Sequence, residues 1–210
     1  HDSHAPPWAP RREAPRIKKH PQLFENNRRW AQRINASNPG FFEQLARQQS
    51  PQHLWIGCAD SRVPANEIVG LLPGELFVHR NIGNLVVHSD MNCLAVIQYA
   101  IDVLRVRHII VCGHSGCGGV QAALERRAPA LVDHWLGHLR ELHRKPEAEL
   151  RTLPPGITLH DRLCELNVRE QVRNVGYTAI VQDAWAREQP LSIHGWIYRV
   201  SDGLAELDRK

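Results

Sequence analysis

Side chains able to do chemistry first gather after the short apolar run 54–57. A thiol, a carboxylate and a guanidinium follow it at alternate positions, as Cys58, Asp60 and Arg62. A short apolar run interrupted by glycine is typical of a buried strand. In open α/β sheets, ligands bind beyond the carboxyl ends of the strands. We therefore expect a strand at 53–58 that ends in a site.

A second apolar run, 108–112, leads into a glycine-rich turn that carries His114 and Cys117. Zinc binds thiolate, imidazole and carboxylate ligands in tetrahedral sites, and catalytic zinc sites keep one position for water or substrate. Cys58, His114 and Cys117 supply three ligands, and Asp60 could reach the fourth position. The two strand ends are therefore predicted to meet around one zinc ion.

Each of these features alone has a simpler explanation. A single cysteine is often a small buried apolar residue, and the HxxC spacing also fits a helix start with a core cysteine. Asp60 and Arg62 could form a surface ion pair of little energetic value. The remaining three cysteines lie in apolar patterns and are expected in the core: Cys93, Cys112 and Cys164. We interpret the histidines other than His114 as ordinary.

Length and composition indicate a single domain with extensions. The chain has 210 residues, of which 42% are hydrophobic, enough for a substantial core. No apolar run approaches the roughly 18 residues of a membrane span, and no secretory signal is visible. Five cysteines, an odd number, argue against a disulfide framework. We expect a cytoplasmic protein whose thiols stay reduced.

The net charge of +4 is concentrated at the N-terminus. Residues 1–22 contain five Lys and Arg against two acidic residues, a net of +3, which leaves +1 for the rest. A near-neutral body without a basic stripe argues against nucleic-acid binding. Five prolines in 1–22 favour a disordered basic arm, and 23–210 is predicted to be one domain.

Strand and helix patterns alternate along this domain. We predict helices at 23–35, 40–48, 66–69, 90–106, 117–127, 131–144 and 159–188, and strands at 53–58, 75–80, 108–112 and 191–200. A turn at 202–203 leads into a short tail with Leu204 and Leu207. The alternation indicates an α/β fold with a mostly parallel central β-sheet flanked by helices. The helices within 23–48 precede it as an N-terminal helical arm.

The combination of motifs is far more specific than its parts. CADSR after one strand and GHSGCGG after another resemble the β-class carbonic anhydrases, and the resemblance covers about 23–204. It is carried by the segments 39–43, 54–64, 73–85, 98–100, 112–121, 164–168 and 194–196. It implies that carbon dioxide and bicarbonate are interconverted by a zinc-bound hydroxide.

The resemblance also implies catalytic roles for Asp60 and Arg62. Arg62 holds Asp60 away from the metal in a charge-assisted pair, and Asp60 then orients the hydroxide. Two thiolates already cancel the charge of zinc, so the bound water should be less acidified and activity should lean alkaline. The family's substrate pocket matches Gln49, Phe77, Tyr99 and Gly118.

In the family, residues from both sides of a dimer interface form this pocket. We therefore expect a dimer or tetramer in which the helices within 23–48 wrap around a neighbouring subunit. Phe77 and Tyr99 alone would also fit ordinary core packing.

Three further residues resemble the bicarbonate-regulated (type II) bacterial subclass: Trp55, Arg80 and Tyr198. The resemblance implies that they bind bicarbonate away from the metal and favour a closed state, at lower pH, with Asp60 on zinc. The alternative is two core aromatics and an Arg80 paired with a carboxylate. Arg199 departs from the family pattern, and an added cation there could tighten or block the site.

Two alternative functions stay open. The chain could be a non-catalytic zinc-binding assembly module in which Asp60 permanently closes the coordination. It could also hydrolyse carbon disulfide or carbonyl sulfide in the same pocket. The Asp60–Arg62 pair favours the carbonic anhydrase over the module, because a structural carboxylate ligand needs no arginine to receive it.

Overall fold

The computed structural model describes residues 18–144, 153 and 155–207, and the predicted disordered arm lies outside this part up to residue 17. The chain divides after Arg47 into two compact units. The first contains α1 (Pro21–Ser37) and α2 (Phe41–Arg47). The rings of Trp30 and Phe42 join these helices in an edge contact with centroids 5.5 Å apart. No residue of α1, which is described throughout, is buried.

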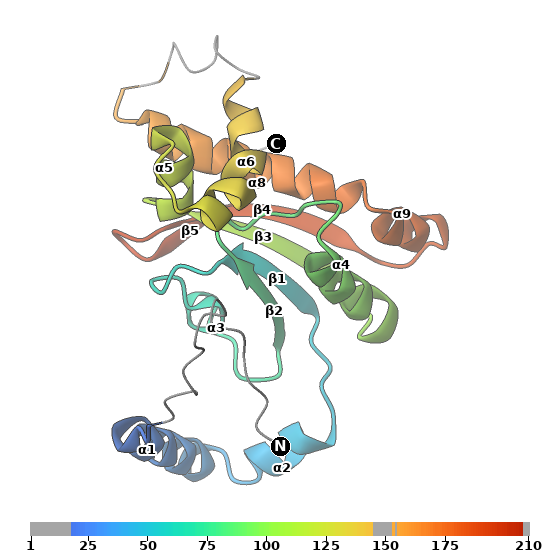
Figure 1. Cartoon of the computed structure of the whole chain (residues 1–210). Helices are drawn as coiled ribbons and strands as arrows, with labels where there is room; N and C mark the ends of the chain where they lie inside the picture. Colours follow the sequence, from blue (N-terminus) through green and yellow to red (C-terminus); the bar gives the residue numbers. More distant parts are fainter. Residues whose placement is uncertain (1–17, 145–152, 154, 208–210) are drawn as a thin grey trace, which may run out of the picture. The chain divides into compact units, whose positions relative to one another are not determined.

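The second unit is built on a five-stranded sheet in the order β2-β1-β3-β4-β5 (Figure 1). The strands are β1 (His53–Cys58), β2 (Leu76–Asn81), β3 (His108–His114), β4 (Ser192–Arg199) and β5 (Leu204–Leu207). The first four run parallel, and β5 is antiparallel to β4. The predicted α/β class with a mostly parallel sheet is confirmed.

Helices connect these strands and cover the sheet. They are α3 (Ala65–Ile68), α4 (Met91–Gln98), the π-helix η1 (Tyr99–Val103), α5 (Gly118–Glu125), α6 (Ala130–Arg144), α8 (Leu159–Gly176) and α9 (Ala179–Ala186). In the described part of the chain, no helix is both long and apolar enough to cross a membrane.

The two faces of the sheet carry separate parts of the core. Leu54, Ile56 and Val111 face a cluster that includes Ile97 of α4 and Val175 of α8. The opposite face carries a second, smaller cluster, in which Trp55, Ile110 and Cys112 pack with residues at and around α3.

A third cluster packs α5 and α6 around the ends of the strands. Cys58 and Cys117 belong to it, together with Leu136 of α6 and Leu163 of α8. The elements that end in the proposed ligands are therefore held by apolar contacts from two further helices.

Two predicted helices differ from the structure. The predicted helix 90–106 begins as expected, with the Asp90 carboxylate accepting from the N–H of Asn92 at 3.1 Å. It ends as an α-helix at Gln98 and continues as the π-helix η1, because a spacing of apolar residues does not distinguish these two helix types. The predicted helix 159–188 is wrong, since it is two helices separated at Tyr177 and Thr178.

The C-terminal tail also differs from expectation. The sequence predicts a short tail after the turn at 202–203, whereas 204–207 form β5, paired with β4 through Arg199 and Leu204. A four-residue segment is too short for its apolar pattern to identify a strand.

Candidate metal centre

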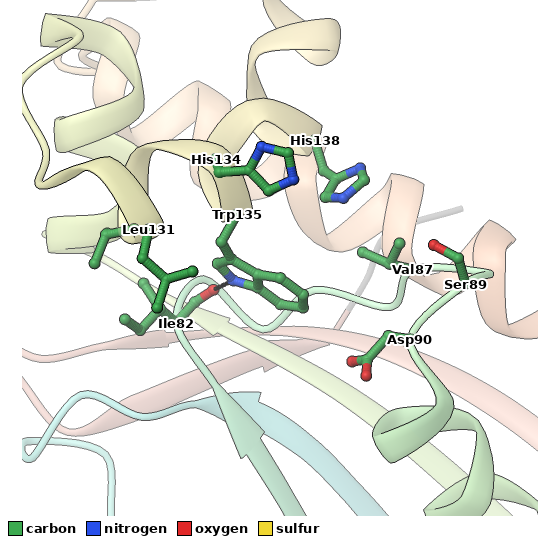
Figure 2. A pocket seen from close by; sticks show the side chains of 9 residues that line it. Ile82, Val87, Ser89, Asp90, Leu131, His134, Trp135 and His138 are labelled. Carbon is green, nitrogen blue, oxygen red and sulfur yellow. Dashed lines mark hydrogen bonds between the residues drawn. The ribbon is translucent and has the colours of Figure 1, made fainter. Parts of the chain in front are cut away.

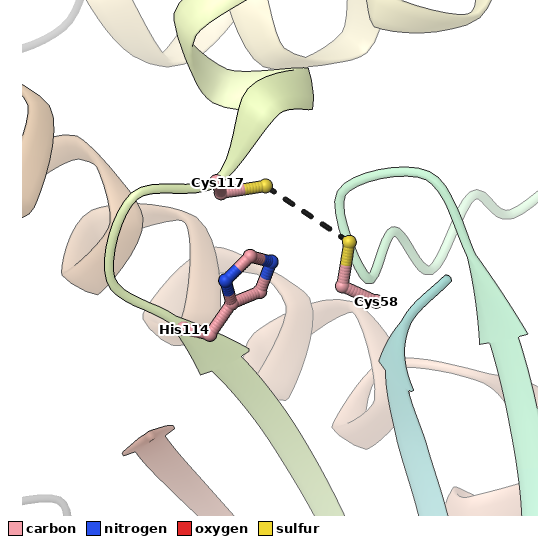
Figure 3. Close-up of side chains that lie close together, drawn as sticks. All are labelled: Cys58, His114 and Cys117. Carbon is pink, nitrogen blue, oxygen red and sulfur yellow. Dashed lines mark hydrogen bonds between the residues drawn. The ribbon is translucent and has the colours of Figure 1, made fainter. Parts of the chain in front are cut away.

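The carboxyl ends of β1 and β3 bring three potential ligands together. Cys58 is the last residue of β1, His114 is the last residue of β3, and Cys117 is the N-cap of α5. The two Sγ atoms lie 4.0 Å apart, and the ligand atoms of all three residues lie within 4.8 Å of one another. Figure 3 shows the imidazole of His114 beside the two sulfur atoms. The structure therefore gathers the three residues selected from the sequence.

The imidazole of His114 is oriented for a ligand. Its Nδ1 lies 2.9 Å from the carbonyl oxygen of Ser115, so the Nδ1–H donates to that carbonyl. Its Nε2 is buried and has no hydrogen-bond partner among the described residues. A buried polar atom without a partner carries a free-energy cost, and a metal ion would use its lone pair. Two thiols and one imidazole oriented by a carbonyl suit zinc.

The two thiols compete for protons. The hydrogen bond with Cys117 lowers the pKa of Cys58 against the opposing effect of burial, and the nearby His114 and the backbone N–H groups of Gly83 and Asp60 also lower it. The hydrogen bond with Cys58, together with burial, raises the pKa of Cys117. A dication would remove this competition, because it binds both sulfurs as thiolates.

Asp60 lies at the edge of the ligand set and is paired with Arg62. Its Oδ1 accepts from the backbone N–H and from Nε of Arg62 at 2.9 and 3.0 Å, and its Oδ2 accepts from Nη2 at 2.7 Å. Nη2 also donates to the carbonyl oxygen of Gly116 at 3.0 Å. Hydrogen bonding by Arg62 holds the pKa of Asp60 well below its usual range. The carboxylate is therefore ionised, with Oδ2 at 3.7 Å from Nε2 of His114.

The four residues matched to the substrate pocket do not gather in one chain. Gly118 directly follows Cys117 and begins α5. The rings of Phe77 and Tyr99 stack on each other, with centroids 5.8 Å apart. Phe77 pairs in register with Leu54, four residues before Cys58, which is roughly 13 Å along the strand. Gln49 is exposed, in the segment that precedes β1.

Trp55 lies buried on the face of the sheet that carries α3. Its indole N–H has no hydrogen-bond partner in the part of the chain that the structure describes. The indole packs over Gly57, where a Cβ would come within 2.3 Å of Nε1, so only glycine fits this position beside the ring. The ring also meets Trp196 edge-on, with centroids 6.2 Å apart.

Arg80 is held by the backbone of the metal loop rather than by a carboxylate. Its Nε donates to the carbonyl oxygen of Cys58 at 2.8 Å, and its Nη2 donates to that of Asp60 at 2.5 Å. The alternative of an Arg80–carboxylate pair, considered above, is not what the structure shows. Arg80 instead connects β2 to the loop that presents the first thiol.

Tyr198 packs against the same cluster as Trp55. Its neighbour Arg199 forms ion pairs with Asp202 and Glu206. Because successive residues of a strand point to opposite faces, the Arg199 cation lies on the other side of β4 from Tyr198. The expectation that Arg199 tightens or blocks the second site is therefore not supported.

Sequence reasoning missed a row of residues on α8 that contact the metal-binding segments. His160 Nε2 donates to the carbonyl oxygen of Cys117 at 2.9 Å, and Asn167 Nδ2 donates to that of Gly83 at 2.8 Å. The interpretation of every histidine except His114 as ordinary is thus wrong for His160. The available signal was the spacing of His160, Asn167, Gln171 and Asn174, which places these polar residues on one face of the predicted helix.

A second group of potential ligands, His79, Asp90 and Cys93, also lies within 4.8 Å. The structure accounts for it without a metal. Asp90 caps α4, and His79 Nε2 lies 3.3 Å from the side-chain nitrogen of Asn81. Burial raises the pKa of Cys93 to about 12, which keeps its thiol protonated.

An open pocket of about 520 Å³ lies beside α6 (Figure 2). It is mainly apolar, and Trp135 closes one side by donating its indole N–H to the carbonyl oxygen of Ile82 at 2.8 Å. None of the three potential zinc ligands lines it.

Comparison with known proteins gives one consistent family. The carbonic anhydrase family model matches residues 53–205. A carbonic anhydrase of Emericella nidulans is 46% identical over 185 residues, covering 88% of this chain and 81% of that protein.

Solved structures agree with this result. A Coccomyxa β-carbonic anhydrase in complex with acetazolamide superimposes with a TM-score of 0.83 at 42% identity, covering 90% of this chain and 86% of that one. A tetrameric β-carbonic anhydrase from Sordaria macrospora gives a TM-score of 0.84 at 37% identity, with 89% and 94% covered.

Proposed function

The chain belongs to the β-carbonic anhydrases, and we propose that it hydrates carbon dioxide reversibly to bicarbonate and a proton at a zinc ion bound by Cys58, His114 and Cys117. The observation that carries this proposal is the buried, unpartnered Nε2 of His114 beside two thiols. When bound, zinc supplies a Lewis acid that makes water nucleophilic near neutral pH.

The ion pair of Asp60 and Arg62 orients the nucleophile. Three hydrogen bonds from Arg62 fix the carboxylate, two to Oδ1 and one to Oδ2, so Oδ2 keeps a lone pair for a further donor. Asp60 Oδ2, close to His114 Nε2, can accept a hydrogen bond from the attacking water and so aim the oxygen lone pair of that water at carbon dioxide. The low pKa of Asp60 keeps it an acceptor across the working pH range.

We propose that the site is completed by a second copy of the chain. Phe77 and Tyr99 lie toward the opposite end of the strands from the zinc ligands, and Tyr99 is 44% exposed. A two-fold interface that exchanges these residues would give each zinc ion a pocket wall from the partner. The similarity to a tetrameric β-carbonic anhydrase supports assembly into a dimer or tetramer.

Stopped-flow assays of carbon dioxide hydration at alkaline pH test the proposal. The zinc-loaded enzyme should be active, lose activity when a chelator removes the metal, and regain it with zinc. Carbonyl sulfide and carbon disulfide serve as competing substrates in the same assay. Zinc-dependent hydrolysis of these two without carbon dioxide hydration would replace the proposal by the hydrolase alternative, and inactivity towards all three would leave an assembly module.

A second proposal concerns regulation by bicarbonate at Trp55, Arg80 and Tyr198. The unpartnered indole N–H of Trp55 favours it, because such a donor suits an anion. Arg80 is bonded to the carbonyls of Cys58 and Asp60, so an anion that drew it away would loosen the metal loop. Asp60 could then leave its ion pair with Arg62 and take the fourth ligand position on zinc, which would close the site.

This regulation predicts activity that rises steeply with alkaline pH and inhibition by bicarbonate beyond product competition. A ligand that binds the closed form better must shift the population toward it. Activity that is flat from neutral to alkaline pH would instead indicate a permanently open enzyme, consistent with the Asp60–Arg62 pair in the structure.

The cysteines support a proposal about location. All five are free and buried, which fits a protein that works in a reducing compartment such as the cytoplasm.

A further inference from the structure

One face of α8 carries a row of buried or half-buried polar and thiol side chains. They are spaced three or four residues apart and therefore line a single stripe of the helix: His160, Cys164, Asn167, Gln171 and Asn174. Asn167 and Gln171 are only 1% and 3% exposed. Buried amides cost free energy unless hydrogen-bonded, so their partners show what this stripe is for.

The amides of the stripe hold the loop that follows β2. Asn167 Nδ2 donates to the carbonyl oxygen of Gly83 at 2.8 Å, and Asn167 Oδ1 accepts from Gln171 at 2.9 Å. Gln171 Oε1 accepts from the backbone N–H of Val86 at 2.7 Å, and Asn174 donates to the Val86 carbonyl oxygen at 3.0 Å. In the part of the chain that the structure describes, these three backbone groups of the loop make no hydrogen bond to another backbone group, and side chains of α8 supply the partners instead.

This loop touches the first thiol. The backbone N–H of Gly83 lies close enough to the thiol of Cys58 to lower its pKa. Gly83 has φ of +81° and no side chain, so its own backbone does little to fix the direction of that N–H. Asn167 donates to the carbonyl oxygen of Gly83. This bond restrains the Gly83 backbone on the carbonyl side of its α-carbon, opposite the N–H.

The second thiol is held by the same helix, one and two turns earlier. His160 donates to the carbonyl oxygen of Cys117, and the backbone N–H of Cys117 lies close enough to the thiol of Cys164 to oppose the rise in its pKa that burial causes. Side chains of the stripe therefore face both polar groups of the Cys117 backbone. The N-cap position of α5 and the Gly83 loop have α8 as their common support.

We propose that two residues of this stripe position the metal thiolates: Asn167 acts on Cys58 through Gly83, and His160 acts on Cys117 through its carbonyl oxygen. Residues that orient the ligands of a metal, or that donate hydrogen bonds to its thiolates, tune the affinity of the site for the metal and the Lewis acidity of the bound ion. This inference rests on the zinc site of the proposed function and adds residues that touch neither metal nor substrate.

The test uses the full chain loaded with zinc, or with cobalt as a spectroscopic probe. Asn167→Leu removes the donor to Gly83 at similar size. Asn174→Leu is the matched control. It makes the same change on the same face of α8, and the side chain that it removes bonds the same loop, but at Val86 rather than at Gly83. Competition with a chelator gives the zinc dissociation constant, and the thiolate-to-cobalt absorption band reports the sulfur environment.

We expect Asn167→Leu to weaken zinc binding by about 10- to 100-fold and to shift the cobalt band. Asn174→Leu should lower thermal stability yet leave affinity and band nearly unchanged. Equal affinities and identical bands in the two variants would overturn the role of Asn167, which would then be a polar core residue only.

His160→Leu tests the other end of the stripe and serves if Asn167→Leu does not fold, because His160 is only partly buried. It should weaken zinc binding and shift the cobalt band as well. Wild-type affinity and spectrum in this variant would overturn the role of His160. A wild-type protein that bound no zinc would instead contradict the proposed function itself, so the two failures are distinguishable.

Discussion

The surroundings of a cysteine decide whether it can bind a metal. Burial raises the pKa of Cys93, Cys112 and Cys164 to about 12, so these thiols stay neutral in the core, as the sequence predicts. Cys58 and Cys117 instead lie at element ends, where the sulfurs are close to each other and to an imidazole. Cys58 ends one apolar run and Cys117 lies in the glycine-rich turn that follows another, which made both predictable from the sequence.

Cys117→Ala should lose zinc and carbon dioxide hydration together, because one thiolate and one imidazole do not complete a tetrahedral site. Cys93→Ala removes a buried thiol far from the ligand set and should keep about one zinc per chain. Metal analysis and stopped-flow assays on the same samples measure both quantities. Full zinc content and turnover in Cys117→Ala would contradict the ligand assignment.

Arg80 shows what the sequence could not reveal at this scale. The motif match selects Arg80 as an anion ligand, but its bonds go to the carbonyls of Cys58 and Asp60. Every residue has a carbonyl, so no residue type marks such acceptors in a sequence. For the same reason, the contacts of His160 and Asn167 with backbone carbonyl oxygens could not be predicted from the sequence.

These bonds also change which variant tests regulation by bicarbonate. Removing Arg80 would disturb the metal loop whether or not an anion binds there. Tyr198→Phe deletes only a hydroxyl and should leave zinc content and alkaline activity intact while weakening inhibition by bicarbonate several-fold. Inhibition equal to that of the wild type, measured by stopped flow over a bicarbonate series, would contradict a role for Tyr198 in anion binding.

At the scale of elements, the pattern predicted the strands better than the helix ends. The strand predicted at 53–58 matches β1. The break between α8 and α9 was missed because the apolar pattern continues across it. Thr178 makes this break by capping α9 through the N–H of Val181 at 3.3 Å while its hydroxyl donates to Val175 at 2.7 Å.

Three adjacent strands bring together a row of histidines that are far apart in the sequence and that no motif connects. His53 of β1 stacks on His108 of β3, with centroids 5.2 Å apart, and His108 Nδ1 lies 3.0 Å from His194 Nε2 on β4. Burial, followed by the charge of His108, lowers the pKa of both His53 and His194, and the Glu75 carboxylate partly offsets this for His53.

These lowered pKa values predict how stability varies with pH. Below about pH 6.5 the unfolded chain binds protons at these histidines more readily than the folded chain does. Their contribution to stability is therefore complete above that pH and is lost as pH falls through the folded pKa values.

His53→Phe keeps a stacked ring and removes one such group. Its free energy of unfolding should therefore improve relative to the wild type as pH falls from 7.5 to 5. Denaturant unfolding of both zinc-loaded proteins at several pH values measures this difference. A difference that does not vary with pH would contradict the assignment.

At the scale of the whole molecule, the three potential zinc ligands lie apart from the aromatic pair Phe77 and Tyr99 within one chain. The resemblance to the family predicts a pocket that is shared across a dimer interface, but the residue pattern alone does not, because Phe77 and Tyr99 also fit core packing. How subunits combine depends on surfaces such as α1, whose Leu23 and Phe24 are exposed. An apolar pattern along one chain does not say what covers such residues.

Mixing two inactive variants tests the shared site. Cys117→Ala removes the metal and Tyr99→Ala removes the pocket wall, so each homodimer should be nearly inactive. Random heterodimers contain one intact site each, and co-expression should restore about a quarter of the wild-type activity per chain. No recovery, with heterodimers verified by mass spectrometry, would place both residues in the site of one chain.

The proposed active site holds one zinc ion per chain, bound by two sulfurs and one imidazole nitrogen. X-ray absorption at the zinc edge of the purified enzyme measures these ligands directly. We expect two sulfur ligands at about 2.3 Å and one imidazole nitrogen at about 2.0 Å, with one lighter ligand completing the site. A zinc site with fewer than two sulfurs, or a folded and active enzyme without zinc, would contradict it.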